Sequence, residues 1–181
     1  VIAVAGELIY NAKVLNCVVE HADDYCNYVE QEEKMIAGLK NYDTNFYRVN
    51  QTKTRNEESN NLTANYNESL AFQYNSVSGY TSDPDDIQRD FLDKLGYNIC
   101  GDNMNIVNTS IIGADSLMNV KYILADYEIN GLKKLEKLDA GNGKNIYQNP
   151  FVLPFAFTYP DSVISIKKKK KNPFLYQNEI Y

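Results

Sequence analysis

Apolar residues follow a helical period in the first part of the chain. Over residues 18–39 they recur mostly three or four positions apart, with one polar gap at Glu32 and Glu33. Such spacing places the apolar side chains on one face of a helix. Gly38 and Asn41 are residue types that mark helix ends. We therefore predict a long amphipathic helix over 18–39.

The period shortens to two directly after this helix. Residues 46–51 are aromatic and β-branched, with Arg48 at the alternating polar position, which predicts a strand. Residues 121–126 have a similar character. Both segments are short and follow helices, as the buried strands of layered folds do. We expect the strands at 46–49 and 122–125 to be neighbours or near-neighbours in one sheet.

A second amphipathic helix is predicted to begin near residue 83. Asp83 is expected to cap it, with Pro84 at the first helical position, and Gly96 supplies a left-handed stop. Its predicted buried stripe consists of Ile87, Phe91, Leu92 and Leu95. Between the first strand and this helix, the pattern predicts an exposed loop over 52–61, a short helix over 69–74 and a strand over 76–80.

The second half of the chain is predicted to be richer in strands. Asp115 opens a short helix over 115–120, and strands are predicted over 121–126, 132–138, 144–149 and 154–160. The Gly-Asn-Gly sequence at 141–143 is a turn signal, which indicates a hairpin. The whole pattern predicts an α/β (or α+β) fold, a single layered domain in which helices pack on a mixed β-sheet.

The chain opens with an uncharged apolar run from Val1 to Ala5, and its first charge is Glu7. A transmembrane helix needs about 20 apolar residues, so this run is too short to span a membrane. No basic residue precedes Lys13, unlike in a secretory signal. Two interpretations remain, namely the first strand or helix of a soluble domain, or the last turn of a membrane helix. The residues alone favour the first.

Composition narrows the range of partners. The chain has 181 residues, which suits one domain with a substantial core. Its net charge of −6, without an evident basic face, argues against nucleic acid as the main partner. There are 15 tyrosines and no tryptophan. Tyrosine can line a carbohydrate-binding surface, but Asn, Lys and Ile are also plentiful, and we favour AT-rich codon usage as the cause.

The cysteines Cys17, Cys26 and Cys100 offer no metal-binding spacing, because no CxxC or CxxH pair is present. Cys26 falls on the apolar stripe of the first helix, so we predict a buried, reduced thiol. If that helix extends back to Cys17, the α-carbons of Cys17 and Cys26 are roughly 13 Å apart. A disulfide requires less than ~7 Å, so no bond between them is predicted. A bond between Cys100 and one of the others stays open.

Acidic pairs are the only candidates for catalysis, and none is assigned. Asp23–Asp24, Glu57–Glu58 and Asp83–Asp85–Asp86 could do acid–base work of the kind found in glycosidases. Each cluster lies on a helix face, in a polar loop or at a helix start, where carboxylates have local electrostatic roles. His21, the single histidine, is interpreted as a surface residue. No cofactor or metal site is predicted.

Two further features have ordinary explanations. Glycosylation sequons occur at Asn50, Asn61, Asn67 and Asn108, as expected by chance in a chain this rich in asparagine. The run Lys167–Lys171 could meet an anionic polymer or lipid headgroups. More often such a run is a solvated strand edge or loop, where lysines discourage edge pairing.

Several short stretches occur in an order that is specific to one group of proteins. They are ELIYNA near the start, FYRV at 46–49, SVSGYTS, FLDKLGY at 91–97, SLMNVKYIL at 116–124, YQNPFVLPFAF at 147–157 and the closing NPFLYQNEIY. In this order they resemble the extracellular region of the bacterial YfhO-type membrane protein family, over nearly the whole chain. One departure is Asn119, which stands where the family's LGVKY-like strand has glycine.

This resemblance implies a place and a function. Residues 1–6 become the outer end of a membrane helix, or simply a fragment boundary, and residues 7–181 an α/β domain on the extracellular side of the cell membrane. The family is similar to GT-C-type glycosyltransferases of Gram-positive bacteria, which use lipid-phosphate-linked sugars to decorate envelope polymers such as lipoteichoic acid. Their catalytic carboxylate is expected in an early outside loop, which this chain does not contain.

The leading hypothesis is therefore a non-catalytic extracellular domain that supports acceptor binding or the membrane-embedded glycosyltransferase. Its implied partners are the membrane-embedded remainder of the same protein and a cell-envelope glycopolymer. One alternative is a free-standing carbohydrate- or polymer-binding module, to which the tyrosine content and the lysine run point. Another is a small hydrolase that uses the acidic pairs.

Overall fold

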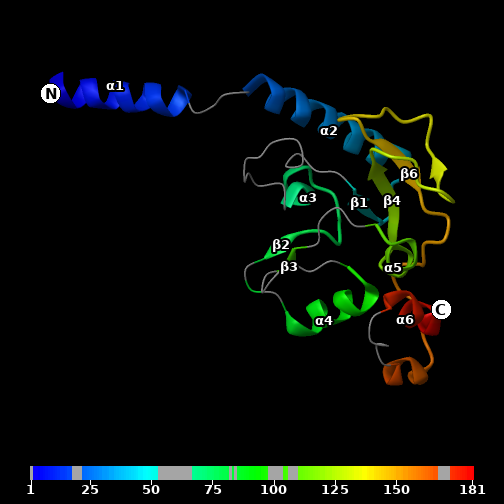
Figure 1. Cartoon of the computed structure of the whole chain (residues 1–181). Helices are drawn as coiled ribbons and strands as arrows, with labels where there is room; N and C mark the ends of the chain where they lie inside the picture. The colour runs from blue at the N-terminus through cyan, green and yellow to red at the C-terminus, as the bar shows by residue number, and fades with distance from the viewer. Residues whose placement is uncertain are drawn as a thin grey trace.

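The computed structural model describes residues 2–17, 22–52, 67–81, 83, 85–97, 104–105, 110–166 and 172–181. The helices are α1 (Ile2–Cys17), α2 (Ala22–Tyr42), α3 (Glu68–Ala71), α4 (Asp86–Leu95), α5 (Ile112–Leu117) and α6 (Pro173–Ile180), with a 3-10 helix at Asp161–Ser165. The strands are β1 (Arg48–Gln51), β2 (Tyr80–Thr81), β3 (Met104–Asn105), β4 (Val120–Ala125), β5 (Lys133–Lys134) and β6 (Asn145–Gln148). Figure 1 shows how they are arranged.

A mixed sheet with the strand order β1-β4-β6-β5 organises the fold. Strand β4 is parallel to β1 and antiparallel to β6, which in turn is antiparallel to β5. Val49 lies opposite Tyr122 in the register of β1 and β4. The predicted α/β class with a mixed sheet is confirmed, and so is the predicted pairing of the 46–49 and 122–125 segments.

Strand β4 is the centre of the core because both of its faces are covered. Tyr122 and Leu124 point to the face on which α2 packs with Met35, Ile36 and Leu39. Ile123 and Ala125 point to the other face, where they belong to a separate cluster with Val120 and Tyr147. Successive side chains of a strand alternate between faces, so a strand covered on both sides is mostly apolar, and Lys121 is the one charged residue of β4.

Helices α4, α5 and α6 form a third apolar cluster, which consists of Leu92, Leu95, Tyr97, Ala114, Tyr176 and Ile180. In Figure 1, α5 and α6 lie beneath the sheet, at the end where β4 begins. Gly96 ends α4 with φ +94°, as predicted. A Cβ atom at Gly96 would meet the side chain of Pro173 at 2.8 Å, so glycine also lets α6 approach α4.

Helix α4 starts two residues later than predicted. Asp85 is the capping residue, and its side chain accepts a hydrogen bond of 2.8 Å from the Gln88 backbone N–H. The predicted stripe is buried only at Leu92 and Leu95, whereas Ile87 is 82 % exposed and Phe91 is partly exposed. The reason is that the apolar cluster with α6 reaches only the last turns of α4.

Several predicted strands are wrong or too long. Residues 154–160 form no strand, because prolines at both ends remove backbone donors. In the 76–80 segment, the Ser76 hydroxyl accepts a hydrogen bond from the Ser78 N–H, which favours a turn, and only Tyr80 joins a strand. The 132–138 segment pairs only at β5. The hairpin turn is confirmed, with positive φ at Asn142 and Gly143.

The ends of the chain are helical. The apolar opening is part of α1, whose described side chains, residues 4–14, are all exposed. Among the described residues, no helix combines the length and apolar character that a membrane span requires. Helix α6 was not predicted, although Asn172 caps it by accepting a hydrogen bond from the Phe174 N–H and Pro173 stands at its first position.

Cys26 is a free thiol, which excludes the Cys17–Cys26 bond as predicted, but it is exposed rather than buried. Helix α2 covers the core only from about Glu32 onward, and Tyr25 is exposed as well. The apolar stripe of α2 therefore extends past the end of the sheet, and Tyr25 and Cys26 lie on the part that the sheet does not cover. Cys100 lies outside the described residues.

Candidate functional site

A cavity of about 430 Å³ opens where the sheet meets the α4–α6 cluster. Its lining residues are Arg48, Phe91, Leu117, Met118, Asn119, Phe155, Phe157, Tyr159, Val163, Tyr176 and Ile180. Arg48 starts β1 and Asn119 immediately precedes β4, so the cavity lies at the amino-terminal ends of the two parallel strands. We call it the aromatic pocket, because five of the eleven lining residues are Phe or Tyr.

Arg48 supplies the positive charge of the aromatic pocket. Its Nη1 donates a hydrogen bond of 2.7 Å to the Met118 carbonyl, and its Cζ lies 5.5 Å from the ring centroid of Phe46 and 5.6 Å from that of Phe155. These contacts hold the guanidinium by cation–π attraction while it keeps several N–H donors. The lining contains no carboxylate, so the electrostatic environment favours an anion.

Asn119 contributes an unusual polar group to the pocket wall. Its backbone has φ +58°, and its Nδ2 donates a hydrogen bond of 2.7 Å to the Leu153 carbonyl. Its Oδ1 is buried and has no hydrogen-bond partner within the described part of the chain. A buried acceptor without a donor costs about 1–3 kcal/mol, so this atom is a place where a donor would stabilise the protein.

The mouth of the aromatic pocket is formed by the loop before the 3-10 helix. Phe155 is 64 % exposed and Phe157 is 41 % exposed, although both also line the cavity. The ring of Phe155 lies 4.5 Å from that of Phe46, and the ring of Phe157 lies 5.2 Å from that of Tyr159. Edge-to-face contacts of this kind fix the orientation of the exposed rings.

A second polar cluster surrounds Asp115, which is fully buried in α5. The Tyr97 hydroxyl donates to Asp115 Oδ1 at 2.7 Å and the Ser110 hydroxyl donates to Oδ2 at 2.6 Å. Burial raises the pKa of Asp115 to about 6, although these hydrogen bonds oppose the shift. The carboxyl group is enclosed by its partners, so it stabilises the fold rather than meeting a ligand.

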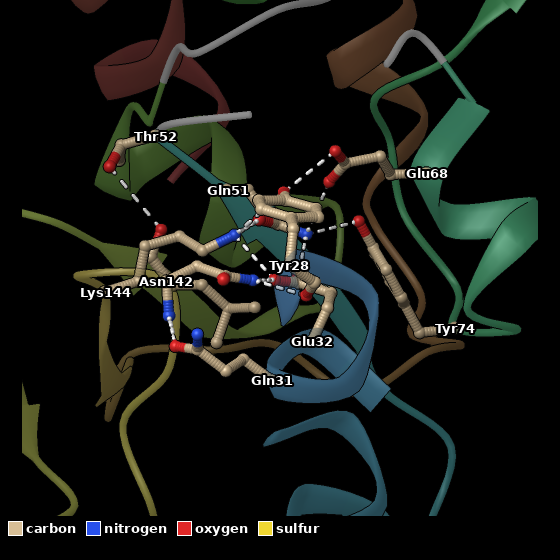
Figure 2. Close-up of polar contacts among 10 residues, drawn as sticks. Tyr28, Gln31, Glu32, Gln51, Thr52, Glu68, Tyr74, Asn142 and Lys144 are labelled. Atoms are coloured by element: carbon tan, nitrogen blue, oxygen red, sulfur yellow. Dashed lines mark hydrogen bonds and ion pairs between the residues drawn. The ribbon is translucent and has the colours of Figure 1, made fainter. Parts of the chain in front are cut away.

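A buried ion pair joins α2 to the hairpin turn before β6, beside the last residue of β1. Lys144 Nζ donates to Glu32 Oε2 at 2.8 Å, and both side chains are almost fully buried. Gln51 Nε2 donates to Glu32 Oε1 at 2.7 Å, and Asn142 Nδ2 donates to Glu32 Oε2 at 2.9 Å. Figure 2 shows these side chains converging from α2, β1 and the hairpin turn.

The same network continues to α3 through a second carboxylate. The Tyr28 hydroxyl donates to Glu68 Oε1 at 2.9 Å, and Gln51 Nε2 also donates to the Tyr74 hydroxyl at 2.8 Å (Figure 2). Burial and the nearby carboxylates raise the pKa of the Tyr28 hydroxyl well above its ordinary value. Because the polar atoms satisfy one another inside the core, we interpret this network as structural.

Asp43 forms the last charged contact of the core. Lys121 Nζ and the Tyr122 hydroxyl both donate to its Oδ2, the latter at 2.8 Å. Burial acts to raise the pKa of Asp43, but hydrogen bonds from Lys121 and Asn45 outweigh it and hold the pKa well below its ordinary value. This contact pins the end of α2 to β4.

None of the described acidic clusters contributes to the aromatic pocket. Asp83, Asp85 and Asp86 lie at the exposed start of α4, and Asp23 and Asp24 lie in α2. Other residues considered in the sequence analysis fall outside the described residues. They are His21, Glu57, Glu58, Asn61, Asn108 and the run Lys167–Lys171. Asn50 is buried in β1 and Asn67 precedes α3. Within the described ranges, no group of three His, Cys, Asp or Glu residues could hold a metal ion.

Sequence reasoning missed the residues that form the site. Arg48 was interpreted only as a polar strand position, and Asn119 only as a departure from a motif. Glu32 was recognised as a polar gap in an apolar stripe, which is a signal for a buried charge, but its partner Lys144 is 112 positions away. Contacts over such separations depend on the strand order, which the local pattern does not contain.

A comparison with protein families identifies the chain. The family described as bacterial membrane protein YfhO matches residues 1–181. The chain belongs to the YfhO family. A search of curated proteins and a search of solved structures each found no match. Family membership confirms that the chain is part of a bacterial membrane protein of the YfhO type, and it suggests a role in membrane-associated glycosylation.

The fold explains one departure within the YfhO pattern. Asn119 adopts a left-handed backbone, which glycine occupies without steric cost and asparagine tolerates better than most other residues. The glycine of the LGVKY-like motif is therefore a backbone requirement at this position. Asparagine meets the requirement and adds an amide group to the wall of the aromatic pocket.

Proposed function

We propose that this chain is an extracellular, non-catalytic domain of a YfhO-type membrane glycosyltransferase that decorates cell-envelope polymers such as lipoteichoic acid. In this proposal the domain supports binding of the acceptor polymer beside the membrane-embedded catalytic part. The family match over residues 1–181 is the observation that carries the proposal.

The geometry of the aromatic pocket supports binding rather than catalysis. Most glycoside hydrolases use two carboxyl groups, one on either side of the reacting bond. The pocket lining has no carboxyl group at all, and Asp85 and Asp86 lie at the exposed start of α4. An arginine can bind an anion, and aromatic rings can pack against a sugar face. Neither contact requires a reaction with the ligand.

The second candidate is a free-standing carbohydrate- or polymer-binding module. The aromatic pocket itself favours it, since such a pocket would bind a saccharide whether or not a membrane part is attached. The two functions differ in one consequence. Under the first function, the cell needs this gene in order to transfer sugar to a polymer, whereas under the second it does not.

Deletion of the gene in the bacterium that encodes this chain tests the proposal. We expect lipoteichoic acid purified from the deletion strain to lose its attached sugar, measured by NMR of the polymer, and the wild-type gene to restore it. A gene carrying Asp85→Asn and Asp86→Asn should restore it equally, because asparagine also caps helices and neither carboxylate is assigned a catalytic role. Unchanged sugar content after deletion would contradict the transferase role.

A further inference from the structure

We propose that the aromatic pocket binds a sugar phosphate unit, with the phosphate at Arg48 and one face of the sugar ring against the exposed rings of Phe155 and Phe157. This inference rests on the proposed function and assigns a ligand class to its pocket. The cavity volume of about 430 Å³ lies within the range of small-molecule sites.

Charge selects the anion. Arg48 is the one charged residue of the lining, and its guanidinium is held by the Met118 carbonyl and by the rings of Phe46 and Phe155. Within the described ranges no ion pair involves Arg48. A planar guanidinium that is already oriented binds phosphate oxygens with little further loss of freedom.

Polar atoms in the wall select a hydroxylated ligand over an acyl chain. Asn119, Tyr159 and Tyr176 are the lining residues with polar side-chain groups besides Arg48, and the buried Oδ1 of Asn119 has no donor within the described part of the chain. A hydrocarbon chain would leave the Asn119 acceptor unsatisfied. A sugar hydroxyl can supply the missing donor once a small movement of the Asn119 side chain uncovers its buried Oδ1, whereas an acyl chain has no donor to offer.

Aromatic rings select a ring-shaped partner. Phe155 and Phe157 are exposed at the mouth, and their orientations are fixed by contacts with Phe46 and Tyr159. Flat rings that are held in place at a pocket mouth can contact the apolar C–H face of a pyranose ring. The sugar and the phosphate would then lie side by side, since Phe155 also borders Arg48.

Binding of α-glucose 1-phosphate to the 181-residue chain, measured by isothermal titration calorimetry, tests the inference. We expect saturable binding of α-glucose 1-phosphate. Glucose alone and inorganic phosphate alone should bind much more weakly. Arg48→Gln should weaken binding at least about tenfold, the effect of losing a charge-assisted hydrogen bond. Its matched control is Lys133→Gln, an exposed lysine on β5, which should leave affinity unchanged.

A second pair of variants tests the aromatic contact. Phe155→Ala should weaken binding about fivefold or more. Phe151→Ala removes a similarly exposed ring that does not line the pocket and should have no effect. Equal unfolding midpoints of all four variants show that the fold is intact. Absence of saturable binding, an equal loss in either control, or octyl phosphate binding as tightly as the sugar phosphate would overturn the inference.

Competition distinguishes the two sources of this chemistry. Displacement by lipoteichoic acid that is only partly glycosylated, and therefore still an acceptor, places the polymer in the pocket, whereas displacement only by vesicles that carry a lipid-linked sugar phosphate places the donor there. Either result supports a sugar phosphate site, but the second removes acceptor binding from the proposed function. Displacement by neither would overturn the inference, while the sugar content of polymer from the deletion strain decides the transferase role independently.

Discussion

Asn119 combines a backbone constraint with an unsatisfied side chain. Its left-handed φ is required where α5 ends and β4 begins, and its amide group serves the pocket wall. The backbone requirement is independent of the amide, so the two can be separated by substitution.

We expect the free energy of unfolding of Asn119→Gly to be about 1 kcal/mol larger than that of Asn119→Ala. The reason is that alanine has a Cβ atom that opposes positive φ, whereas glycine has none. Both variants lose the same hydrogen bond to Leu153, so the comparison isolates the backbone. Urea unfolding followed by circular dichroism measures the difference. An alanine variant as stable as the glycine variant would show that the left-handed conformation is not required.

Asp115 makes stability depend on pH in a predictable direction. Burial raises its pKa from 3.8 to about 6, so the folded protein binds a proton more readily than the unfolded chain. The contribution of Asp115 to stability is therefore most favourable below pH 4 and is lost as pH rises through 6.

Asp115→Asn should remove this dependence, since asparagine does not ionise. We expect the unfolding free energy of Asp115→Asn minus that of the wild type to increase from pH 4 to pH 7 by an amount on the order of 3 kcal/mol. Subtraction cancels the opposite effect of Asp43, whose low pKa makes stability fall in acid in both proteins. A difference that is constant with pH would contradict the assignment.

At the scale of elements, the Glu32–Lys144 pair fastens α2 to the turn before β6. Removing one partner leaves an uncompensated charge in the core, and Glu68 adds a second carboxylate to the same network. Breaking a buried pair costs about 3–5 kcal/mol, whereas replacing both charges by apolar groups is much less costly.

Lys144→Met should therefore lower the unfolding free energy by about 3–5 kcal/mol, and adding Glu32→Leu should restore part of the loss. Lys34→Met, which breaks the exposed pair with Asp139, is the control and should change stability little. Guanidinium unfolding of the four proteins measures these effects. If the double variant is no more stable than Lys144→Met, the ion pair is not the source of the cost.

The elements that the sequence predicted well are those whose signals are local. Helix α2, strand β4 and the Asn142–Gly143 turn carry periodicity or special backbone preferences within a few residues. Residues 154–160 were predicted as a strand because their composition is apolar and aromatic, but strand formation also needs a partner edge. The site was not predictable, because Arg48 and Phe155 meet only after β1 and the 151–160 loop are brought together.

At the scale of the whole molecule, the polymer-binding role depends on which side of the membrane the domain occupies. Envelope polymers lie outside, so a domain inside the cell could not bind them. Cys26 provides a natural probe, because its thiol is free and exposed on α2.

Labelling of Cys26 in intact cells with a membrane-impermeant maleimide is the most direct measurement. It uses the protein produced in its bacterium with Cys17→Ser and Cys100→Ser, so that Cys26 is the reporting thiol of this chain. We predict full labelling before lysis, with no further increase once the cells are broken open. Labelling of Cys26 only after lysis would contradict the extracellular placement on which acceptor binding rests.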